Sequence, residues 1–423
     1  MKIVEVNCVP YGSTGMIARS ITTLSKKYGE SFFAYSWTKK KRRNVLEDEF
    51  LIGGLLEKYI SIKLEFLTGN IGSFGFFSTK KLINKIKKIK PNIVHLHNLH
   101  EGYINLKMLF NFLDKENINV VWTLHDCWSF TGHCPHFDMI KCNKWKKKCY
   151  NCSIYKNYPK SLFDNSKKMY ERKKKIFTGL KEDNLTIVTP SIWLSNMVKK
   201  SFLSKYNTVV INNGINLDVF KPSTSNDYFK NKYGIVNKKV LLGVSYNWTN
   251  NKGLDIFVKL ANDLDSKYQI VLVGTSKKID KILPPNVISI HRTSSQEELI
   301  KIYSSADMFI NPTREEVFGL VNVEALACGL PVITFNTGGS PEIIDDSCGY
   351  VIEKDNYDEL KKYITDYFKN ERFKKYNCIK RARSFDGNEK YHEYIDLFKK
   401  ICTKGNYKDG ESDEKSNNNN IIW

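Results

Sequence analysis

The chain has 423 residues, of which 41% are hydrophobic and 26% charged, and its formal net charge is +21. This length suits two domains of about 200 residues, each large enough to bury its own core. No apolar run approaches the roughly 18 residues that a membrane-spanning helix needs, and "MKIVEVNCVPYG" lacks a signal peptide's pattern. We therefore expect a cytoplasmic protein whose ten cysteines are reduced or metal-bound rather than paired in disulfides.

The positive charge is concentrated in the first half of the chain. Residues 1–200 carry 35 Lys and Arg against 16 Asp and Glu, whereas residues 201–423 carry 31 against 29. A lysine-rich composition alone would not leave the second half balanced, so we expect a basic face for nucleic acid or an anionic membrane. Few of the basic residues are arginine, the better residue for bidentate phosphate and base recognition, which favours the membrane.

Short β-branched runs alternate with amphipathic segments, as expected of helices wrapped on parallel sheets. The predicted strands of the first half are 2–8, 31–37, 92–98, 119–126, 185–191 and 208–214. Those of the second half are 238–246, 268–274, 286–292, 307–312, 331–336 and 349–353. The predicted fold class is therefore α/β, with two doubly wound domains in series.

Residues 80–90, "KKLINKIKKIK", place an apolar stripe among six lysines. The stripe consists of Leu82, Ile83, Ile86 and Ile89. Two interpretations stand equally: an ordinary surface helix that packs this stripe on the sheet, or a helix whose lysines face anionic lipid headgroups.

A cysteine-rich insertion near 127–160 contains "CPHFDMIKCNKWKKKCYNC". The four thiols of this quoted stretch are Cys134, Cys142, Cys149 and Cys152. The closing Cys-x2-Cys with two further thiols suits a tetrahedral structural zinc, although His133 and His136 offer competing ligands. Free thiols are the next alternative and disulfides the last. The lysines around Trp145 suggest that the insertion faces an acceptor or a membrane.

The domain boundary is predicted after "INNGINLDVFKPSTS", where Asn-Gly, Pro and Ser interrupt the pattern. The predicted domains are 1–214 and 215–385. The polar, low-complexity end from residue 403 is predicted to be disordered, because it buries too little surface to offset the entropy of ordering.

One segment combines two carboxylates with a helix start. "FINPTREEVFGLVNVEALACG" places Glu316 and Glu324 after a predicted strand, where ligands of open parallel sheets bind. On a helix, eight residues advance about 12 Å and rotate by about 80°, so both carboxylates would lie on similar faces. The first-turn amides of Phe318, Gly319 and Leu320 would point outward between them.

This arrangement suits an elongated ligand with a polyol at each end and phosphate in the middle, as in a nucleotide sugar. A single helix glutamate is more often a solvated charge. Glu324, however, is surrounded by Val323, Ala325 and Leu326, where an unpaired carboxylate is costly.

Further candidates follow other predicted strands, and each has a plain structural alternative. Gly338 and Gly339 of "NTGGSPEII" could form an anion-binding turn or an ordinary loop. Lys252 could neutralise a diphosphate or be a solvated lysine. His125 of "TLHDCW" could contact a ligand or be a structural histidine. The fourth candidate is a glycine loop that could wrap a phosphate, Gly12, Ser13, Thr14 and Gly15; it lacks the third glycine of the dinucleotide fingerprint.

Together these motifs resemble the family 4 glycosyltransferases, retaining enzymes of GT-B fold, from residue 1 to about 400. The family's E-x7-E motif is met by Glu316 and Glu324, and "GGSPEII" follows at the usual interval. The resemblance implies transfer of a sugar from a nucleoside diphosphate donor, held mainly by the C-terminal domain, to an acceptor held mainly by the N-terminal domain. It implies no divalent metal for catalysis.

The resemblance also implies residue roles. Glu316 would contact the donor sugar, Glu324 the ribose and Lys252 the diphosphate. His125 would contact the donor hexose, and the segment 12–15 would close over the phosphates. The last helix, 386–402, would cross back to the first domain. One departure is the absence of the family's arginine shortly before Lys252; Lys277 and Lys278 are candidate substitutes.

The predicted function is hexosyl transfer to a glycan or lipid-linked acceptor in bacterial surface polysaccharide biosynthesis, for capsule or O-antigen, at the inner face of the plasma membrane. Two other classes stay open. A nucleic-acid-binding protein would use the basic half but leave both glutamates without a role. A nucleotide-sugar epimerase would use the same donor without an acceptor.

Overall fold

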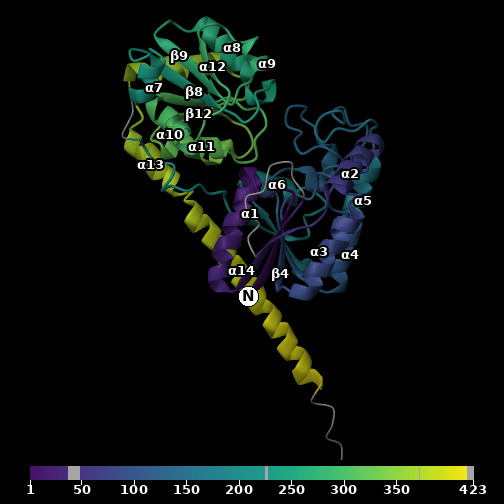
Figure 1. The fold of residues 1–423 in the computed structure, drawn as a ribbon. Coiled ribbons are helices and arrows are strands. Elements are labelled where there is room, and N and C mark those ends of the chain that lie inside the picture. The colour runs from purple at the N-terminus through teal and green to yellow at the C-terminus, as the bar shows by residue number, and fades with distance from the viewer. Residues whose placement is uncertain (37–47, 224–226, 371, 417–423) are drawn as a thin grey trace, which may run out of the picture.

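The computed structural model describes residues 1–36, 48–223, 227–370 and 372–416. Two parallel sheets, each flanked by helices, follow one another along the chain (Figure 1). The prediction of two doubly wound α/β units is confirmed, and every predicted strand is present. One further strand, β3 (Glu49–Leu51), was not predicted, because three residues carry too short a pattern to recognise.

The first sheet has seven parallel strands in the order β3-β2-β1-β4-β5-β6-β7. Its other strands are β1 (Lys2–Asn7), β2 (Glu30–Tyr35), β4 (Ile93–Leu96), β5 (Asn119–Thr123), β6 (Leu185–Thr189) and β7 (Asn207–Val210). Its helices are α1 (Gly12–Ser25), α2 (Leu55–Thr68), α3 (Phe76–Ile89), α4 (Leu106–Lys115), α5 (Ser166–Phe177) and α6 (Ile192–Lys199). The strand order reverses between β1 and β4, and ligand crevices of open sheets form beyond the strand ends at such a point.

The second sheet has six parallel strands in the order β10-β9-β8-β11-β12-β13. These are β8 (Lys239–Val244), β9 (Tyr268–Val273), β10 (Val287–Ile290), β11 (Met308–Asn311), β12 (Val332–Phe335) and β13 (Gly349–Ile352). The helices are α7 (Asp227–Lys232), α8 (Leu254–Asp263), α9 (Lys277–Asp280), α10 (Gln296–Ser305), α11 (Leu320–Ala327), α12 (Tyr357–Asn370) and α13 (Lys375–Arg383). Here the order reverses between β8 and β11, the two strands that precede Lys252 and Glu316.

Helix α14 (Gly387–Ser416) crosses back from the second sheet to the first and lies along α1 (Figure 1). Tyr394, Ile395 and Phe398 are buried in one apolar cluster with Ile3 and Ile17. The helix continues to Ser416, whereas the sequence interpretation ended it at 402 and expected disorder from 403. Extending an existing helix costs far less than nucleating one, which accounts for a polar segment continuing α14. Residues 417–423 lie outside the described residues.

The two chain crossings between the sheets meet at Gly214 and Gly387. The Ile215 amide donates to the Phe385 carbonyl (3.1 Å), and the Gly387 amide donates to the Ile215 carbonyl (2.7 Å). A Cβ on Gly214 would lie 2.4 Å from the Gly387 Cα, so a side chain at this position would force the crossings apart. The crossing lies where the sequence places the domain boundary.

Helix α3 packs its apolar stripe inward. Leu82 and Ile86 are 0% and 1% exposed, and Ile83 and Ile89 are half-buried, so the stripe behaves as that of an ordinary surface helix. Among the described residues, no helix combines the length and the apolarity that a membrane crossing requires.

Candidate active site

Glu316 and Lys252 form a charge pair at the strand ends where the second sheet reverses its order. The Lys252 Nζ lies 3.0 Å from the Glu316 Oε2, and the Glu316 Oε1 accepts from the Val317 amide at 3.1 Å. Burial opposes ionisation of Glu316, but the Lys252 ammonium outweighs it and lowers the pKa of the carboxyl. Glu316 is therefore a carboxylate at neutral pH.

The two glutamates do not share a helix face, contrary to the sequence interpretation. Helix α11 begins only at Leu320, and Glu316 lies in the loop before it. The expected helix geometry is wrong for Glu316 because Gly319, with φ +100°, ends the loop in a left-handed conformation. Glu324 lies on α11, where its Oε2 accepts from the Tyr303 hydroxyl at 3.0 Å. Burial raises the pKa of Glu324 to about 7.

The segment "NTGGSPEII" packs on the backbone of the Glu316 loop. Gly338 has φ +57°, and a Cβ there would lie 1.6 Å from the Glu316 carbonyl oxygen. A Cβ on Gly339 would lie 2.3 Å from the Val317 carbonyl oxygen and 2.7 Å from the Ser191 Cβ. Both glycines are therefore required by close approach, and Gly339 brings the two domains into contact.

Unsatisfied polar atoms gather beside this glycine segment. The Asn322 Nδ2, the Thr337 Oγ1 and the Ser340 Oγ are buried and have no hydrogen-bond partner. The first and the last of these each lie 3.2 Å from where a Cβ on Gly319 would sit. Buried polar groups without partners are rare and costly in folded proteins, so their presence points to a polar ligand at the α11 N-terminus. Free helix N–H groups at such an end suit a phosphate.

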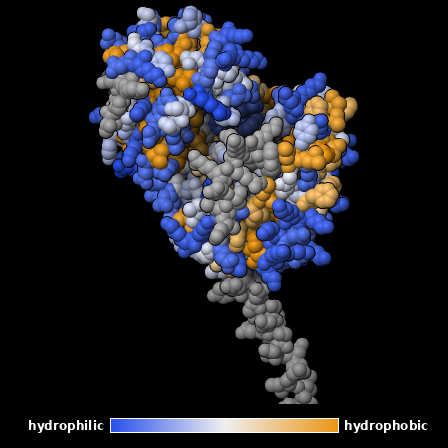
Figure 2. All heavy atoms as spheres, viewed as in Figure 1, coloured by the Kyte–Doolittle hydropathy of each residue, from blue (hydrophilic) through white to orange (hydrophobic). Residues whose placement is uncertain are grey.

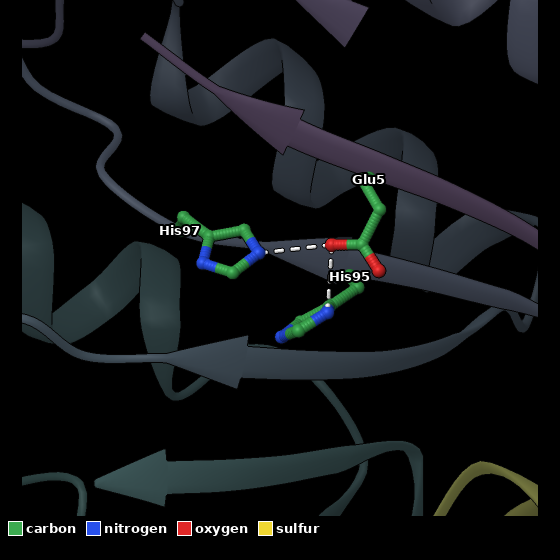
Figure 3. Close-up of side chains that lie close together, drawn as sticks. All are labelled: Glu5, His95 and His97. Atoms are coloured by element: carbon green, nitrogen blue, oxygen red, sulfur yellow. Dashed lines mark hydrogen bonds and ion pairs between the residues drawn. The ribbon is translucent and has the colours of Figure 1, made fainter. Parts of the chain in front are cut away.

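His125, which follows β5, continues into a buried hydrogen-bonded chain. Its Nε2 lies 3.0 Å from the His97 Nδ1, and the two rings stack with an interplanar angle of 11°. The His97 Nε2 lies 2.9 Å from the Glu5 Oε2, and the same oxygen lies 2.8 Å from the His95 Nδ1 (Figure 3). Glu5 comes from β1 and the two histidines from β4 and its end. All three are buried.

Burial sets the protonation of this chain. It lowers the pKa of His95 and of His97 to about 3, and that of His125 to about 4. Burial also raises the pKa of Glu5 to about 7, against the opposing hydrogen bond from His97. The three imidazoles are therefore neutral, and each carries one N–H.

When Glu5 is ionised, its hydrogen bond with His97 fixes which nitrogen of His125 carries the proton. With the Glu5 carboxylate accepting at the His97 Nε2, the His97 Nδ1 accepts from the His125 Nε2–H. The His125 Nδ1 keeps its lone pair and is an acceptor for a ligand hydroxyl. His95, the other histidine beside Glu5, is linked to α14. Its Nε2 lies 2.8 Å from the Thr123 Oγ1, and this hydroxyl donates to the Tyr394 hydroxyl of α14 at 3.2 Å.

Glu5, His95 and His97 are the one group among the described residues whose possible metal-ligating atoms lie within 4.8 Å of one another. The His97 Nε2 is hydrogen-bonded to the Glu5 Oε2 at 2.9 Å, and the His95 Nδ1 lies 2.8 Å from the same oxygen. The second nitrogen of each ring has another hydrogen-bond partner, so the three side chains form a buried polar cluster. The sequence interpretation missed it. The available signal was the alternation in "VHLHN", which places both histidines on one face of a strand.

Asp126 holds the segment next to His125. Its Oδ2 lies 3.1 Å from the His100 Nε2, and its Oδ1 accepts from the Trp128 amide at 2.8 Å. Burial opposes ionisation of Asp126, but the His100 hydrogen bond prevails and lowers its pKa. The His100 Nδ1 lies 3.2 Å from the Tyr158 hydroxyl.

The segment Gly12 to Gly15 is the first turn of α1 rather than a separate glycine loop. A Cβ on Gly15 would lie 2.6 Å from the Val9 carbonyl oxygen, so this glycine serves close packing. Thr14 Oγ1 lies 3.3 Å from the Asn7 Nδ2, which ties the turn to the end of β1. Gly12 and Ser13 are exposed at the helix N-terminus, where an anion is favoured.

The cations that could substitute for the family's arginine differ in whether they are already bound to carboxylates. Arg314 donates to both Asp255 carboxylate oxygens (2.7 and 2.8 Å) and to Asp355 (2.6 Å), so it is committed to holding the Lys252 loop. The predicted substitutes Lys277 and Lys278 are exposed at the start of α9. Arg292, which the sequence interpretation did not name, lies over the Tyr246 ring in the segment that lacks the family arginine, 5.7 Å from the ring centroid.

The cysteine-rich insertion reaches the second domain. The Met139 amide donates to the Glu315 Oε1 (3.4 Å), and the Lys354 Nζ donates to the Asp138 carbonyl (3.4 Å). On the other side, Glu342 accepts from the Ile192 and Trp193 amides at the N-terminus of α6 (2.8 and 2.7 Å). Both domains therefore meet beside Glu316.

The four thiols of the insertion line one cavity of about 290 Å³, together with His133. Cys134 and Cys152 interact directly, and the Cys149 Sγ accepts from the Gly132 amide at 3.2 Å. Among the described residues, however, no three of these sulfur atoms lie within 4.8 Å of one another, so a closed tetrahedral site is not formed. All ten cysteines are free. Structural zinc stays a prediction, which metal analysis of the purified protein tests. One zinc per chain would support it, and the absence of stoichiometric zinc would contradict it.

Comparison with known proteins identifies the class. Residues 225–385 match the family model "Glycosyl transferases group 1". The WcaC protein of Escherichia coli (strain K12), provisionally named as a colanic acid biosynthesis glycosyl transferase, is 24% identical over 328 residues, 74% of this chain and 77% of that protein. The comparisons therefore favour a glycosyltransferase over a nucleic-acid-binding protein or an epimerase.

Solved structures agree on the fold. A sucrose-phosphate synthase from Thermosynechococcus elongatus superposes with a TM-score of 0.69 at 16% identity, over 95% of this chain and 99% of its own. HepE of Anabaena, in complex with UDP and glucose, gives a TM-score of 0.65 at 15% identity, over 94% and 99%. The fold is GT-B. Within this fold, residues 225–385 are the part of the chain that matches the group 1 family model.

Replacing Gly338 tests whether the close approach to Glu316 matters. Gly338→Ala combines a left-handed φ with a clash against the Glu316 carbonyl, so we expect it to displace the loop and lower turnover by about tenfold or more. Gly234→Ala is the matched control, because Gly234 has φ +64° and no atom within 4 Å of a Cβ. It should cost about 1 kcal/mol of unfolding free energy and leave turnover unchanged. Equal turnover in both variants would contradict the expectation.

Proposed function

We propose that the chain is a retaining hexosyltransferase whose donor is a nucleoside diphosphate sugar. The observation that carries the proposal is the Lys252–Glu316 pair beside the unsatisfied donors at the α11 N-terminus. An ammonium and free N–H groups suit a diphosphate, and a carboxylate suits sugar hydroxyls. The complex of the similarly folded HepE with UDP and glucose supports a donor of this kind.

Each site residue has a proposed role. Lys252 and the amides of Phe318, Gly319 and Leu320 bind the diphosphate, with Gly338 and Gly339 leaving room for it. Glu316 accepts from hexose hydroxyls and Glu324 from the ribose diol. The His125 Nδ1 accepts from a hexose hydroxyl. The α1 N-terminus at Gly12 faces the phosphates from the other domain.

The proposed reaction is a front-face displacement. The acceptor oxygen attacks the anomeric carbon on the face from which the diphosphate leaves; the bond from this carbon to the phosphate oxygen breaks as the new glycosidic bond forms. The departing phosphate oxygen takes the acceptor's proton, so no second carboxylate pair of glycosidase type is required. Lys252 stabilises the charge that develops on the leaving group. Anomeric analysis of the product tests this: a retained configuration supports it, and an inverted linkage ends it.

The acceptor is proposed to be a glycan or a lipid-linked glycan of a bacterial surface polysaccharide, such as capsule or O-antigen. The protein would act in the cytoplasm, at the inner face of the plasma membrane. Two observations support this: the colanic acid name of the WcaC relative, and the excess of basic residues in the first half of the chain. Transfer to a lipid-linked acceptor extracted from cells, with no transfer to free monosaccharide, is the expected result.

Donor affinity should depend on the ionisation of Glu324. Since burial raises the pKa of this carboxyl to about 7, the carboxylate that accepts ribose hydroxyls forms as the pH rises from 6 to 8. Affinity for a nucleotide sugar, whose diphosphate does not titrate in this range, should rise by about tenfold in all between pH 6 and pH 8. Glu324→Gln should remove this dependence and Glu297→Gln, at an exposed acid of α10, should keep it. Titration calorimetry across the pH range is the measurement.

A further inference from the structure

Helix α2 presents apolar side chains to solvent and polar ones to the protein. Its two buried residues are Ser61 and Glu65. Its exposed apolar residues are Leu55, Leu56, Tyr59, Ile60, Ile62, Leu64, Phe66 and Leu67. This reverses the usual arrangement of a surface helix, whose apolar face packs on the core.

Neighbouring segments extend this face. Phe76 and Phe77 at the start of α3 are 52% and 79% exposed, and Leu162 and Phe163 are 46% and 62% exposed. Hydrogen bonds hold both segments against α2, from the Phe77 amide to Glu57 and from the Leu162 amide to the Phe66 carbonyl. We call the eight apolar residues of α2 and these four the α2 apolar surface. Figure 2 shows apolar residues gathered at the position of α2 in Figure 1.

The acidic residues of α2 are turned inward. Glu57 accepts from the Phe77 and Ser78 amides at 2.8 and 2.9 Å, and so caps α3. Glu65 accepts from the Gly72 amide at 2.7 Å. These two are the only acids between residues 51 and 100, which contain eight lysines. The outward face of this part of the chain is therefore apolar and positive.

The lysines border the α2 apolar surface directly. Phe77 lines a shallow depression together with Lys80, Lys81, Lys85 and Lys88 of α3. Apolar side chains next to lysines match the interface of a bilayer with anionic headgroups, where the former enter the acyl boundary and the latter meet phosphates. A second copy of the same surface would place these lysines against one another, which costs binding energy.

The same helix lies beside the acceptor side of the site. A Cβ on Gly102 would lie 2.8 Å from the Ile62 Cγ1, so α2 packs on the segment that follows β4. The adjacent Glu101 accepts from the Tyr158 hydroxyl at 3.2 Å, and this hydroxyl also lies 3.2 Å from the His100 Nδ1. Glu101 and Tyr158 thus connect the segment on which α2 packs to His100, the partner of Asp126 next to His125.

We propose that the α2 apolar surface docks on the interface of an anionic bilayer and brings the acceptor side of the first domain to the membrane. This proposal rests on the proposed function, which supplies the identity of the acceptor. The partner is the lipid surface itself, with a diffuse match of charge and apolar area rather than a pocket for one lipid.

Vesicle sedimentation tests the proposal. The wild-type chain should bind vesicles of equimolar phosphatidylglycerol and phosphatidylcholine more tightly than vesicles of phosphatidylcholine alone. Leu56→Gln with Phe77→Gln removes the two most exposed side chains of the α2 apolar surface and should weaken this binding by about tenfold or more. Lys81→Gln with Lys85→Gln should weaken it by about tenfold.

Matched controls lie on the second domain. Ile282 is 58% exposed, and Ile282→Gln should leave vesicle binding unchanged. Lys267→Gln with Lys281→Gln removes the same charge from exposed positions and should also leave it unchanged. Unchanged binding in both test variants, or indifference of the wild type to both vesicles, would overturn the proposal. A dimer by light scattering that Leu56→Gln with Phe77→Gln dissociates, without vesicle binding, would assign the surface to a second copy instead.

The docking and the proposed function fail separately. Nucleotide-sugar binding without lipid tests the donor site alone. Intact donor binding with no vesicle binding overturns the docking alone, and intact vesicle binding with no donor binding overturns the proposed function alone.

Discussion

Glu316→Gln is expected to lower kcat by about 100- to 1,000-fold while changing the donor Kd little. Glutamine keeps the size of the side chain and the hydrogen bond from the Val317 amide but removes the negative charge that holds the Lys252 ammonium 3.0 Å away. Lys252 then loses its fixed position beside the leaving group. The loss therefore falls on the transition state rather than on donor binding.

Initial rates at saturating donor, with calorimetry for the Kd, separate the two effects. Glu297→Gln, at an exposed acid of the same domain, controls for a general effect of removing a carboxylate. A Glu316→Gln enzyme with wild-type kcat would remove Glu316 from the reaction.

Glu5→Leu is expected to lower the free energy of unfolding by about 3–5 kcal/mol. The Glu5 Oε2 accepts from the His97 Nε2 and lies 2.8 Å from the His95 Nδ1 in a fully buried site, so leucine leaves the buried His97 N–H without an acceptor. Glu5→Gln keeps a carbonyl oxygen and should cost about half as much or less. Urea unfolding of the three proteins gives these differences.

Glu5→Leu also tests whether the position of His125 depends on Glu5. When leucine replaces Glu5, His97 is no longer held and the His125 Nε2 loses its fixed partner, so Glu5→Leu should lower kcat even where the protein is fully folded. Val4→Ala, at a buried position of the same strand, should destabilise the protein without lowering kcat. If both variants lose kcat in proportion to their stability, the chain from Glu5 to His125 has a structural role alone.

Strand positions and the two-sheet architecture were predictable, because buried parallel strands are continuous β-branched runs bounded by polar segments. The loop around Glu316 was not. Residue spacing describes a helix equally well from 313 or from 320, and it does not reveal that Gly319 takes the left-handed φ of +100° that decides between them. The pairing of Lys252 with Glu316 follows from the adjacency of β8 and β11, which a single sequence does not reveal.

Helices α2 and α3 show a second feature that the sequence alone did not predict, namely which face of a helix is exposed. The lysine-rich α3 has an ordinary buried stripe, whereas α2 carries the exposed apolar face. In α2, the polar residues Glu57, Ser61 and Glu65 recur every four positions and so form one stripe of the helix. Periodicity predicts that stripe, but which side faces the protein depends on the amides of α3 and of Gly72 that the two glutamates cap.

A thermal-shift panel of nucleotide sugars tests the central claim most directly, since a ligand that binds only the folded chain raises its melting temperature. We predict that at least one nucleoside diphosphate sugar raises the melting temperature of the wild-type chain and of Glu316→Gln, and that Glu324→Ala responds much less. A panel in which no nucleotide sugar shifts the wild-type chain, or in which Glu324→Ala responds like the wild type, would contradict the account.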